Sequence, residues 1–581
     1  RNEVQQVKRY WKYIRPYIQY YILGPCFMMM EVVGDVLLPY MLAKIINQGI
    51  AERNVVYIIK IGVIMGFIAV IMAVGGVLGA WFASKAAMNF GADLRMDLFE
   101  KIQQFSFQNI DNFSTGSLIT RLTNDITQIQ NMIMMTLRMC LRSPGILIGA
   151  MVMAFVISPK LAAIFIIVLP VLAVLIVVIM RRAFPQFRTL QEKLDALNSC
   201  IQEGLVGIRL IKSFVRGDYE EMRFEKRNQQ LKEANLTAMK TMLLYTPLMT
   251  LALNITTVVV VWAGGNMIVA GNMQVGDLTA FTNYIVQIMS SLTMLSIAFL
   301  NWARAIASFR RVGEVLDEKI DLTDENAKHK DRAVCEGSVE FQNVSFRYYK
   351  NSPEWVIENI SFKLEAGKTL GIIGSTGSGK STLVSMIPRL YDTDEGTVLV
   401  DGINVRDYGL KPLREGIGMV LQNNTLFSGS IIENLKWGDE HADEKAVRKA
   451  AQNAQAAGFI DSFKDGYRTR LEQSGNNVSG GQKQRLCIAR ALLKCPKILI
   501  LDDSTSAVDT ATERAIREAL HSEYKDMTKI IIAQRIRSVM DADEILVLDN
   551  GKTAGFGTHE QLLADCPVYR EIYDVQNGRE E

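Results

Sequence analysis

The 581-residue chain is too long for one compact hydrophobic core, so two or more domains are expected. Hydrophobic residues make up 49% of it and charged residues 22%, a mixture that fits a membrane part joined to a polar part. The net charge of only +3 gives no reason to expect nucleic acid as a partner, and seven scattered cysteines without CxxC spacing support neither a disulfide framework nor a zinc site.

Six apolar stretches in the first half of the chain have the length of membrane-spanning helices. The clearest is Leu161 to Met180, twenty residues without a charge, long enough at about 1.5 Å per residue to cross a ~30 Å hydrocarbon core. The other five predicted spans are residues 17–46, 55–84, 137–158, 243–270 and 277–300. Lys and Arg concentrate in the long polar segments after the second and fourth spans, so both termini are expected in the cytoplasm. We therefore predict an α-helical six-span transmembrane domain over residues 1–315 of a multi-pass protein of the cell membrane.

Two carboxylates lie inside the first predicted span. Glu31 and Asp35 are four residues apart and share one face of a helix. A charge at mid-membrane costs about 2.5–3.5 kcal/mol, so such residues usually face a cavity or a partner. Two interpretations stay open: the pair lines a substrate pathway, where it attracts cations or gates, or it makes a structural hydrogen bond to a neighbouring helix.

Other polar residues of this half have different expected roles. Arg138 and Arg142 are expected to extend toward the inner headgroups. Four amide side chains could line a pore, and the second and third of them share a helix face: Asn254, Asn283, Gln287 and Asn301.

The second half begins after a predicted charged linker, residues 316–336, and occupies residues 337–581. Val339 to Phe346 alternates as a strand does and is followed at once by Arg347 and Tyr348. This half has the pattern of an α/β domain.

A phosphate-binding loop follows the predicted strand Thr369 to Ile373. The segment Gly374 to Ser381 is GSTGSGKS, whose glycines let the backbone curl so that N–H groups and a helix N-terminus face phosphate oxygens. Lys380 is suited to neutralise the β and γ oxygens of a nucleoside triphosphate, and Ser381 to ligate Mg²⁺.

Two later segments complete the pattern. Val478 to Gln482, VSGGQ, precedes a helix-like run, and the apolar strand Ile498 to Leu501 ends in Asp502. With the phosphate loop, these segments resemble the ATPase domain of ABC transporters. Six spans with two long cytoplasmic excursions resemble the exporter-type membrane domain of the same family. The predicted fold is therefore an α-helical six-span transmembrane domain fused to an α/β P-loop ABC ATPase domain.

The resemblance implies ATP and Mg²⁺ as cofactors. Tyr348 would stack on adenine, although Tyr349 is next to it, while Ser381, Gln422 and Asp502 would hold Mg²⁺. In a head-to-tail pair of ATPase domains, the VSGGQ segment would contact the ATP of the other domain. The implied ATP-binding residues are Tyr348, Gly374, Ser375, Thr376, Gly377, Ser378, Gly379, Lys380, Ser381, Thr382, Gln422, Ser479, Gly480, Gly481, Gln482 and Asp502.

The resemblance also extends to segments that couple the domains. Phe113 to Ser117 with Arg121 to Asp125 is similar to the first coupling region of the family. Gly207-Ile208 with Phe214-Val215-Arg216 and Tyr219-Glu220 is similar to the second. Ser506 to Asp509 resembles the loop that links the two ATP sites, and Glu472 stands where the family contacts the opposite coupling helices.

Two positions depart from the family pattern. The family has a Glu after the strand-end Asp and a His about thirty residues later, and this chain has Asp503 and Gln534 there. Asp503 is one methylene shorter than Glu, and the Gln534 amide replaces an imidazole. The pattern resembles the degenerate subunit of heterodimeric bacterial multidrug exporters and implies a second half-transporter with intact Glu and His. The alternative is that Asp503 still serves as the catalytic base.

The function implied is export of small amphipathic compounds by alternating access, driven by ATP binding and hydrolysis. Lipid export, peptide export and siderophore import by an exporter-shaped protein are alternatives, as is a channel or regulator that ATP gates. A soluble ATPase or nucleic-acid remodeller is excluded by the six spans.

Overall fold

The computed structural model describes residues 9–349, 352–503 and 508–577, except for some side chains of α11 and α12. The chain forms two compact units. The first consists of the chain up to Gln103 together with Gly116–Asp317. The second consists of Gln104–Thr115 together with the chain from Glu318 onward. We call these the helical unit and the ATPase unit.

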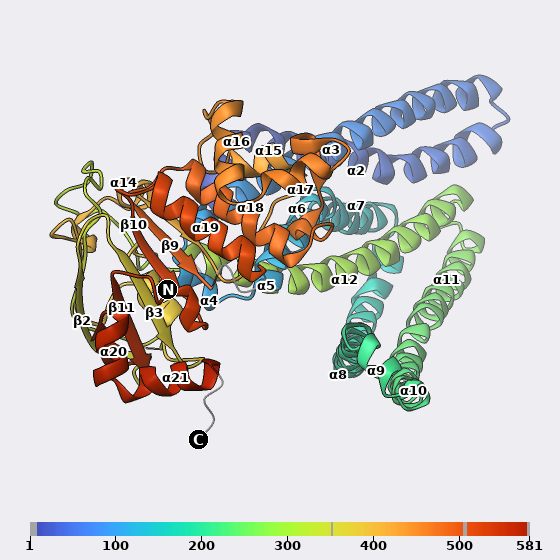
Figure 1. Cartoon of the computed structure of the whole chain (residues 1–581). Coiled ribbons are helices and arrows are strands. Elements are labelled where there is room, and N and C mark those ends of the chain that lie inside the picture. The colour runs from blue at the N-terminus through green and yellow to red at the C-terminus, as the bar shows by residue number, and fades with distance from the viewer. Residues whose placement is uncertain (1–8, 350–351, 504–507, 578–581) are drawn as a thin grey trace. The chain divides into compact units, whose positions relative to one another are not determined.

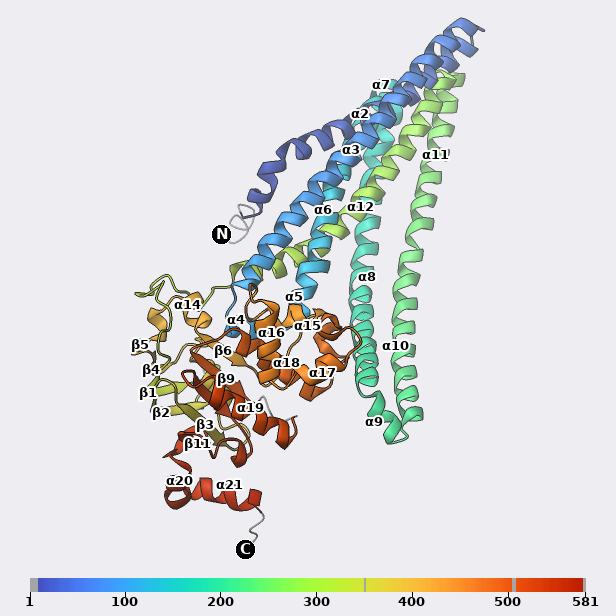
Figure 2. The ribbon, with the colours of Figure 1, turned by 45° about the horizontal axis from the view of Figure 1, so that its top comes forward.

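The helical unit consists of long helices joined by short turns (Figure 2). Its elements are η1 (Arg15–Tyr17), α2 (Ile18–Lys44), η2 (Ile45–Ile50), α3 (Val55–Gln103), α5 (Thr115–Thr120), η3 (Arg121–Asp125), α6 (Ile126–Met139), α7 (Arg142–Ile157), α8 (Pro159–Val206), α9 (Ile208–Ser213), α10 (Gly217–Leu243), α11 (Tyr245–Val269) and α12 (Val275–Asp317). Helix α2 packs along α3, α8 along α10, and α12 along α7.

Five helical stretches of the described chain have the length and apolar composition needed to cross a membrane. They are Arg9–Ile50, Val55–Gln103, Thr115–Ile157, Pro159–Val206 and Gly217–Val269. Each corresponds to one of the predicted spans, of which 137–158 and 243–270 extend one residue past the helical stretch. The sixth predicted span, residues 277–300, lies in the continuous helix α12, some of whose side chains are not described, and it stays a prediction.

Local sequence explains where the long helices start and how closely they approach. Helix α8 begins after Ser158, whose Oγ accepts a hydrogen bond from the Leu161 amide at 3.4 Å, with Pro159 in the first turn. Between α2 and α3, a Cβ added at Gly79 would lie 3.1 Å from the Gly24 carbonyl oxygen. Small residues thus permit the close backbone contact typical of membrane helices.

The ATPase unit contains two β-sheets that share one core (Figure 1). A mostly parallel sheet has the order β12-β11-β3-β10-β9-β6, and an antiparallel sheet has the order β2-β1-β4-β5. The strands are β1 (Val339–Phe346), β2 (Ile357–Leu364), β3 (Thr369–Gly374), β4 (Glu395–Val400), β5 (Ile403–Asn404), β6 (Ile417–Val420), β9 (Ile498–Asp502), β10 (Thr528–Ile532), β11 (Glu544–Asp549) and β12 (Lys552–Gly557), and a two-residue pair β7 (Gly429–Ser430) and β8 (Arg470–Leu471) lies apart. The strands predicted at Val339, Thr369 and Ile498 are β1, β3 and β9.

Helices and short turns complete this unit. They are α4 (Phe107–Asp111), α13 (Lys380–Ser385), η4 (Val405–Asp407), α14 (Leu410–Glu415), α15 (Ile431–Leu435), α16 (Glu444–Asn453), α17 (Ala457–Ser462), η5 (Gly466–Arg468), η6 (Gln473–Gly475), α18 (Gly480–Leu493), α19 (Thr510–Glu523), η7 (Ile536–Ser538), α20 (His559–Asp565) and α21 (Pro567–Asn577).

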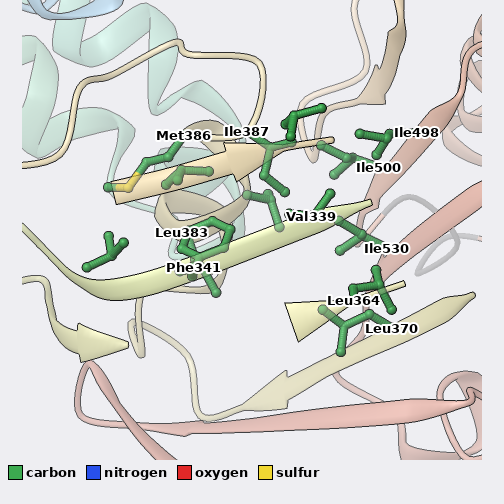
Figure 3. Close-up of a cluster of buried hydrophobic side chains, with 14 of the residues drawn as sticks. Val339, Phe341, Leu364, Leu370, Leu383, Met386, Ile387, Ile498, Ile500 and Ile530 are labelled. Carbon is green, nitrogen blue, oxygen red and sulfur yellow. The ribbon is translucent and has the colours of Figure 1, made fainter. Parts of the chain in front are cut away.

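Both faces of the parallel sheet are buried. Figure 3 shows Ile498, Ile500 and Ile530 of the parallel sheet beside Phe341 of β1, and all belong to one core cluster. The alternate residues Leu499 and Leu501 join a second cluster with α18 and α19. Burial on both faces explains why these strands are continuous apolar runs in the sequence.

A buried ionic cluster stabilises the helical unit. The Asp125 carboxylate is 2% exposed and accepts hydrogen bonds from the Ser308 hydroxyl and the Arg311 Nε, each at 2.8 Å. This cluster joins η3 to α12, and each removed partner would leave a buried polar group unsatisfied.

We predict that Asp125→Ala lowers the free energy of unfolding by about 2 kcal/mol, because it removes the acceptor of the buried Ser308 hydroxyl and of Arg311. Thermal unfolding of the purified chain, followed by tryptophan fluorescence, measures the effect. Asp195→Ala is the control, because the Asp195 side chain is exposed and bonds only to Gln191 four residues away. Equal melting temperatures for the two variants would contradict the prediction.

Candidate functional site

The phosphate loop connects β3 to α13 and has the backbone geometry of an anion site. Gly377 and Gly379 have φ of 84° and 91°, in the left-handed region that glycine adopts without strain. A Cβ at Gly379 would lie 2.9 Å from the Val356 carbonyl oxygen. Helix α13 begins at Lys380, so its free N–H groups and positive dipole end open toward the loop. The loop can therefore hold phosphate oxygens.

Lys380 lies across the mouth of this loop. Its Nζ donates hydrogen bonds to the carbonyl oxygens of Gly374 at 2.9 Å and Ser375 at 2.7 Å. Burial lowers the pKa of the Lys380 ammonium, and the nearby carboxylates Asp503 and Asp502 oppose that shift. The amine is thus held in place by backbone oxygens before it meets a ligand.

Ser381 and Asp502 form a pair of oxygen ligands beside Lys380. The Ser381 hydroxyl donates to the Asp502 Oδ1 at 2.9 Å, and Asp502 is 4% exposed at the carboxyl end of β9. Burial raises the pKa of the Asp502 carboxyl, and the Ser381 hydrogen bond lowers it in part. A hydroxyl and a carboxylate fit Mg²⁺, which prefers oxygen ligands and keeps several waters and phosphate oxygens.

Gln422 lies at the same edge of the sheet. It follows β6, the strand that pairs with β9, and its side chain is exposed. The described part of the chain holds no group of three or more His, Cys, Asp and Glu that could by itself hold a metal ion. Phosphate oxygens would have to complete the coordination of Mg²⁺.

The two residues that depart from the family pattern contact each other. The Gln534 Nε2 donates to the Asp503 Oδ2 at 2.8 Å. The Asp503 amide donates to the Ile532 carbonyl at 3.1 Å, and Asp503 has a left-handed φ of 46°. Burial raises the pKa of Asp503, and the Gln534 hydrogen bond is the largest opposing contribution. One oxygen of the carboxylate is therefore occupied by a neutral amide.

A residue that the sequence analysis missed holds the Gln534 segment. The Gln576 side chain of α21 donates from Nε2 to the Gln534 carbonyl and accepts at Oε1 from the Ile536 amide, both at 2.8 Å. The contact spans about forty residues, and no local pattern in the sequence indicates it. Gln576 thus fixes the backbone on both sides of Arg535.

Of the two adjacent tyrosines, Tyr348 lies beside the phosphate loop. Its hydroxyl lies 2.8 Å from the Thr382 Oγ1, whereas Tyr349 is 76% exposed. The Tyr348 ring meets the Tyr391 ring edge-on with centroids 5.3 Å apart. Tyr348 is thus the better placed of the two to stack on a base above the loop.

Tyr391 connects Tyr348 to the short helix α4. The Tyr391 hydroxyl donates to the Asp111 Oδ2 at 3.0 Å, and its ring packs against Phe107 with centroids 5.9 Å apart. Asn109 of α4 donates to the Glu318 carboxylate at 3.1 Å and the Lys319 carbonyl at 2.9 Å. Helix α4 is therefore bonded to the ATPase unit on two sides.

Helix α4 lies just before the predicted first coupling region, whose role stays a prediction. The segment that belongs to the ATPase unit is Gln104–Thr115, so the predicted region overlaps it only at its start, and Arg121 to Asp125 lies in the helical unit. The docked helix begins with a Ser106 capping box, in which the Asn109 side chain replaces the usual Glu or Gln. Because of that departure, no usual capping-box pattern marks the start of α4 in the sequence.

The VSGGQ segment forms the start of α18. Ser479 accepts a hydrogen bond from the Gln482 amide at 3.3 Å, and the Gln482 side chain accepts one from the Ser479 amide at 2.9 Å. This capping box leaves Ser479 and Gly480 exposed, at the positive end of a fourteen-residue helix. Glu472 is also exposed, and Ser506 and Ala507 of the linking loop lie outside the described residues.

The membrane carboxylates have a partner that the sequence analysis placed elsewhere. The Arg142 guanidinium of α7 donates to Glu31 at 2.9 Å and to Asp35 at 3.3 Å. Arg142 is thus an ion-pair partner rather than a residue extended toward the headgroups, because two desolvated carboxylates need a cation. A cavity of about 420 Å³ adjoins the pair and is lined by Glu31, Arg138 and Arg142.

The predicted pore residues separate into two groups. The Gln287 Nε2 donates to the Asp35 carbonyl at 2.7 Å, which ties α12 to the ionic pair on α2. Asn283 donates to the Thr279 carbonyl of its own helix, and Asn254 is exposed. The side chain of Asn301 lies outside the described residues.

Comparisons with known proteins agree with this architecture. Residues 21–292 match the family described as ABC transporter transmembrane region, and residues 357–506 match the family described as ABC transporter. The chain is 39% identical to the uncharacterized ABC transporter ATP-binding protein YfiB of Bacillus subtilis (strain 168), with 98% of each chain covered. It is 33% identical to YgaD of the same organism, named as a candidate multidrug export ATP-binding/permease protein, over 98% of this chain and 99% of YgaD.

A solved structure, titled a bacterial Atm1-family ABC exporter with ATP bound, has the same fold. The TM-score is 0.80 at 24% sequence identity, over 97% of this chain and 98% of the other.

We predict that Tyr391→Leu weakens ATP binding about threefold to tenfold, because it removes the edge-on ring contact, worth about 0.5–1.5 kcal/mol, that orients Tyr348. Tyr391→Phe keeps the ring and is expected to bind ATP as the wild type does, but to exchange the amide hydrogens of residues 106–111 faster. Titration with a fluorescent ATP analogue and hydrogen exchange measure the two effects. Equal ATP affinity of the Leu and Phe variants would contradict the assignment.

Proposed function

The chain belongs to the ABC transporter family, whose ATPase domain binds ATP with Mg²⁺, and we propose that it is one half of a heterodimeric exporter with a degenerate ATP site of its own. ATP binding and hydrolysis by the pair drive export of small amphipathic compounds across the cell membrane by alternating access. The chain spans the membrane several times, with both termini in the cytoplasm.

The hydrogen bond between Gln534 and Asp503 carries the proposal of a degenerate site. A general base must come within about 2.6–3.2 Å of the attacking water and must accept its proton. Asp503 has a shorter reach than Glu, and one of its oxygens accepts the Gln534 amide at 2.8 Å. The Gln534 amide cannot take up or release a proton near neutral pH, as an imidazole can. ATP is therefore held at this site and turned over slowly.

The residues that hold the nucleotide are intact. Tyr348 stacks on the adenine, the loop amides from Gly374 to Thr382 and the Lys380 amine bind the phosphates, and Ser381 with Asp502 orients the metal. Mg²⁺ bound with ATP neutralises charge on the β and γ oxygens. ATP binding without efficient hydrolysis follows, because the residues that bind the phosphates and the metal are intact and the residue at the position of the base is altered.

The exposed start of α18 supports a second half-transporter as partner. Ser479, Gly480 and Gly481 present a hydroxyl and backbone donors at the positive end of α18, a geometry suited to a γ-phosphate. No hydrogen bond joins this capping box to the phosphate loop among the described residues of the chain. The donors serve the ATP of the partner, whose own Glu and His complete the competent site.

The tip between α8 and α10 also supports a partner. Figure 2 shows α9 as the turn that joins these two long helices. Large apolar side chains at this tip are exposed in the chain by itself, among them Leu210 at 62%, Phe214 at 69% and Val215 at 87%. Apolar side chains gathered on a polar helix pair are typical of a docking surface. We assign this tip to the ATPase domain of the partner.

The charge balance of the membrane cavity supports amphipathic substrates. Glu31 and Asp35 share one cation, Arg142, and the second cation of the cavity wall is Arg138. The remaining wall includes Met28, Met72 and Met139, flexible side chains that adapt to different shapes. A cavity wall with few charged groups, most of them paired or near a pair, and with several methionines suits compounds that are mostly apolar, and the printed name of YgaD points the same way.

We predict that the chain alone hydrolyses ATP slowly and that the pair with its partner half-transporter hydrolyses it fast. Within the pair, Ser479→Arg is expected to abolish activity because it blocks the donors that face the competent ATP. Asp503→Ala is expected to change the hydrolysis rate of the pair less than about twofold. Loss of a working general base would instead lower that rate by a factor of about 10²–10⁴. A phosphate-release assay measures these rates. Vigorous hydrolysis by the chain alone that Asp503→Ala removes would falsify the degenerate site and favour a homodimer with Asp503 as base.

Restoring both altered residues gives a complementary prediction. The double substitution Asp503→Glu with Gln534→His is expected to raise turnover at this site at least about tenfold, because base and imidazole are returned to their places. The measurement uses a pair whose partner carries an inactivated base, so that only this site contributes. Asp503→Glu alone is the matched control, with a smaller gain expected. No gain from the double variant would show that the limitation lies elsewhere.

The ion pair predicts a change in substrate preference. Arg142→Gln leaves Glu31 and Asp35 without their cation, so the preference for monocationic over uncharged amphiphiles is expected to rise about fivefold. Arg142→Lys keeps the charge and is expected to keep the wild-type preference. Uptake of a cationic and an uncharged dye into inverted vesicles measures the ratio. An unchanged ratio in the Gln variant would remove these carboxylates from the substrate pathway.

A further inference from the structure

A second cavity of the ATPase unit lies away from the phosphate loop. It has a volume of about 970 Å³ and is walled by α19, by β10 and by the segment from Arg537 to Ala542. We call it the α19 cavity. Lys529 and Thr369 in its wall lie near the amino ends of β10 and β3. The phosphate loop, by contrast, follows the carboxyl end of β3, so the two sites are at opposite edges of the sheet. The volume is within the range of small-molecule sites.

Lys529 in the wall of this cavity is buried without a polar partner. The residue is 5% exposed, and no described residue makes a hydrogen bond or ion pair with its ammonium. The closest candidate, Asp543, already accepts hydrogen bonds from the Lys368 Nζ at 2.9 Å and the Thr369 amide at 2.8 Å. The stem of Lys529 is buried and its ammonium opens onto the cavity, so an anion there would supply the hydrogen-bond partner that the described residues do not.

Burial lowers the pKa of Lys529, and Asp543 and Asp526 oppose the shift only in part. A bound anion would favour the charged ammonium. Ligand binding and protonation of Lys529 therefore support each other.

Helix α19 presents two arginines and a histidine to the same space. Arg514, Arg517 and His521 are spaced at three and four residues and so share one face of the helix. The Arg517 Nη1 donates to the Arg537 carbonyl at 2.6 Å and to Asp541 at 3.2 Å, but its Nε is buried and has no hydrogen-bond partner in the described structure. The Arg514 guanidinium is exposed and likewise has no described partner. The Arg514 guanidinium is therefore free to bind a ligand, whereas the Arg517 guanidinium must turn away from the Arg537 carbonyl and Asp541 to do so.

The remaining wall is partly apolar. Leu520, Ile531 and Met540 line the cavity together with the cationic groups. Four cationic residues, Arg514, Arg517, Lys529 and Arg537, compare with two carboxylates, Glu518 and Asp541, of which Asp541 pairs with Arg517. The cavity thus combines excess positive charge with an apolar surface.

We propose that the α19 cavity binds a phosphate-bearing small organic molecule. Its phosphate contacts Lys529, Arg514 and Arg517, since guanidinium groups bind phosphate oxygens in a fixed fork and an ammonium adds a compact charge. Its organic body lies on Leu520, Ile531 and Met540. A macromolecular anion fits less well, because Lys529 is accessible only inside the cavity. The proposal does not depend on the heterodimer or on the degenerate site.

The site would also affect the segment that carries Gln534. The turn η7 starts two residues after Gln534, and Arg517 is bonded to the Arg537 carbonyl in that turn. A phosphate that recruits Arg517 competes with this hydrogen bond. Occupancy of the α19 cavity would then be transmitted to the turn next to Gln534.

AMP is the probe for the test, with the full-length chain in lipid nanodiscs. Lys380→Ala is introduced into every sample to weaken the phosphate loop, and AMP binding is measured by isothermal titration. Saturable binding is expected, with Lys529→Met weakening it at least about tenfold. Lys525→Met is the matched control, because Lys525 is exposed four residues away and does not line the cavity, and it is expected to leave affinity within about twofold.

Arg514→Gln provides a second test on an exposed residue, for which loss of folding is not expected, and it should weaken AMP binding about fivefold. Absence of saturable binding overturns the proposal. Binding that Lys529→Met and Arg514→Gln leave unchanged also overturns it, since AMP would then occupy the nucleotide site.

Discussion

The ATP site depends on three neighbouring parallel strands that end at one edge of a sheet. Ile532 of β10 lies between Ile372 of β3 and Asp502 of β9 in register, so β9 and β10 end at one level and β3 ends two residues further on. The phosphate loop, the buried carboxylate and the Gln534 segment meet there for that reason. Alternate residues of β9 enter two different cores, which holds the strands in this register, because a slip of one residue would exchange the two faces.

This edge separates nucleotide binding from catalysis. The groups that bind phosphates are backbone amides, Lys380 and Ser381, and their placement is set by β3 and α13. The groups that would act on the attacking water come from the ends of β9 and β10. In the proposed function, the residues at positions 503 and 534 therefore affect the attacking water and leave phosphate binding intact. The two altered side chains also satisfy each other at 2.8 Å, so they cost the fold little.

Sequence reasoning located the strands and the phosphate loop because their signals are local. Apolar runs fix β3 and β9, and the GSTGSGKS segment needs glycine where φ is positive. It missed Tyr391, Asn109 and Gln576, whose partners lie tens to hundreds of residues away. It placed Arg142 at the headgroups because an arginine near the end of a membrane helix has the same sequence pattern whether it extends to the headgroups or pairs with a neighbouring helix. Pairing across helices becomes visible only when α2 and α7 are brought together in space.

Two lysines of the ATPase unit, the half-buried Lys380 and the buried Lys529, differ in whether their ammonium has a hydrogen-bond acceptor. Burial lowers the pKa of both Lys380 and Lys529. Two loop carbonyls hold the Lys380 amine, so its position is fixed without a ligand. Lys529 has no such acceptor among the described residues, although it lies beside a cavity with two arginines of α19 in its wall. An apolar residue at position 529 would fit β10 better for stability alone, because the following positions of the strand are isoleucines. In the proposed site, an anion in the α19 cavity supplies the acceptor that Lys529 lacks among the described residues.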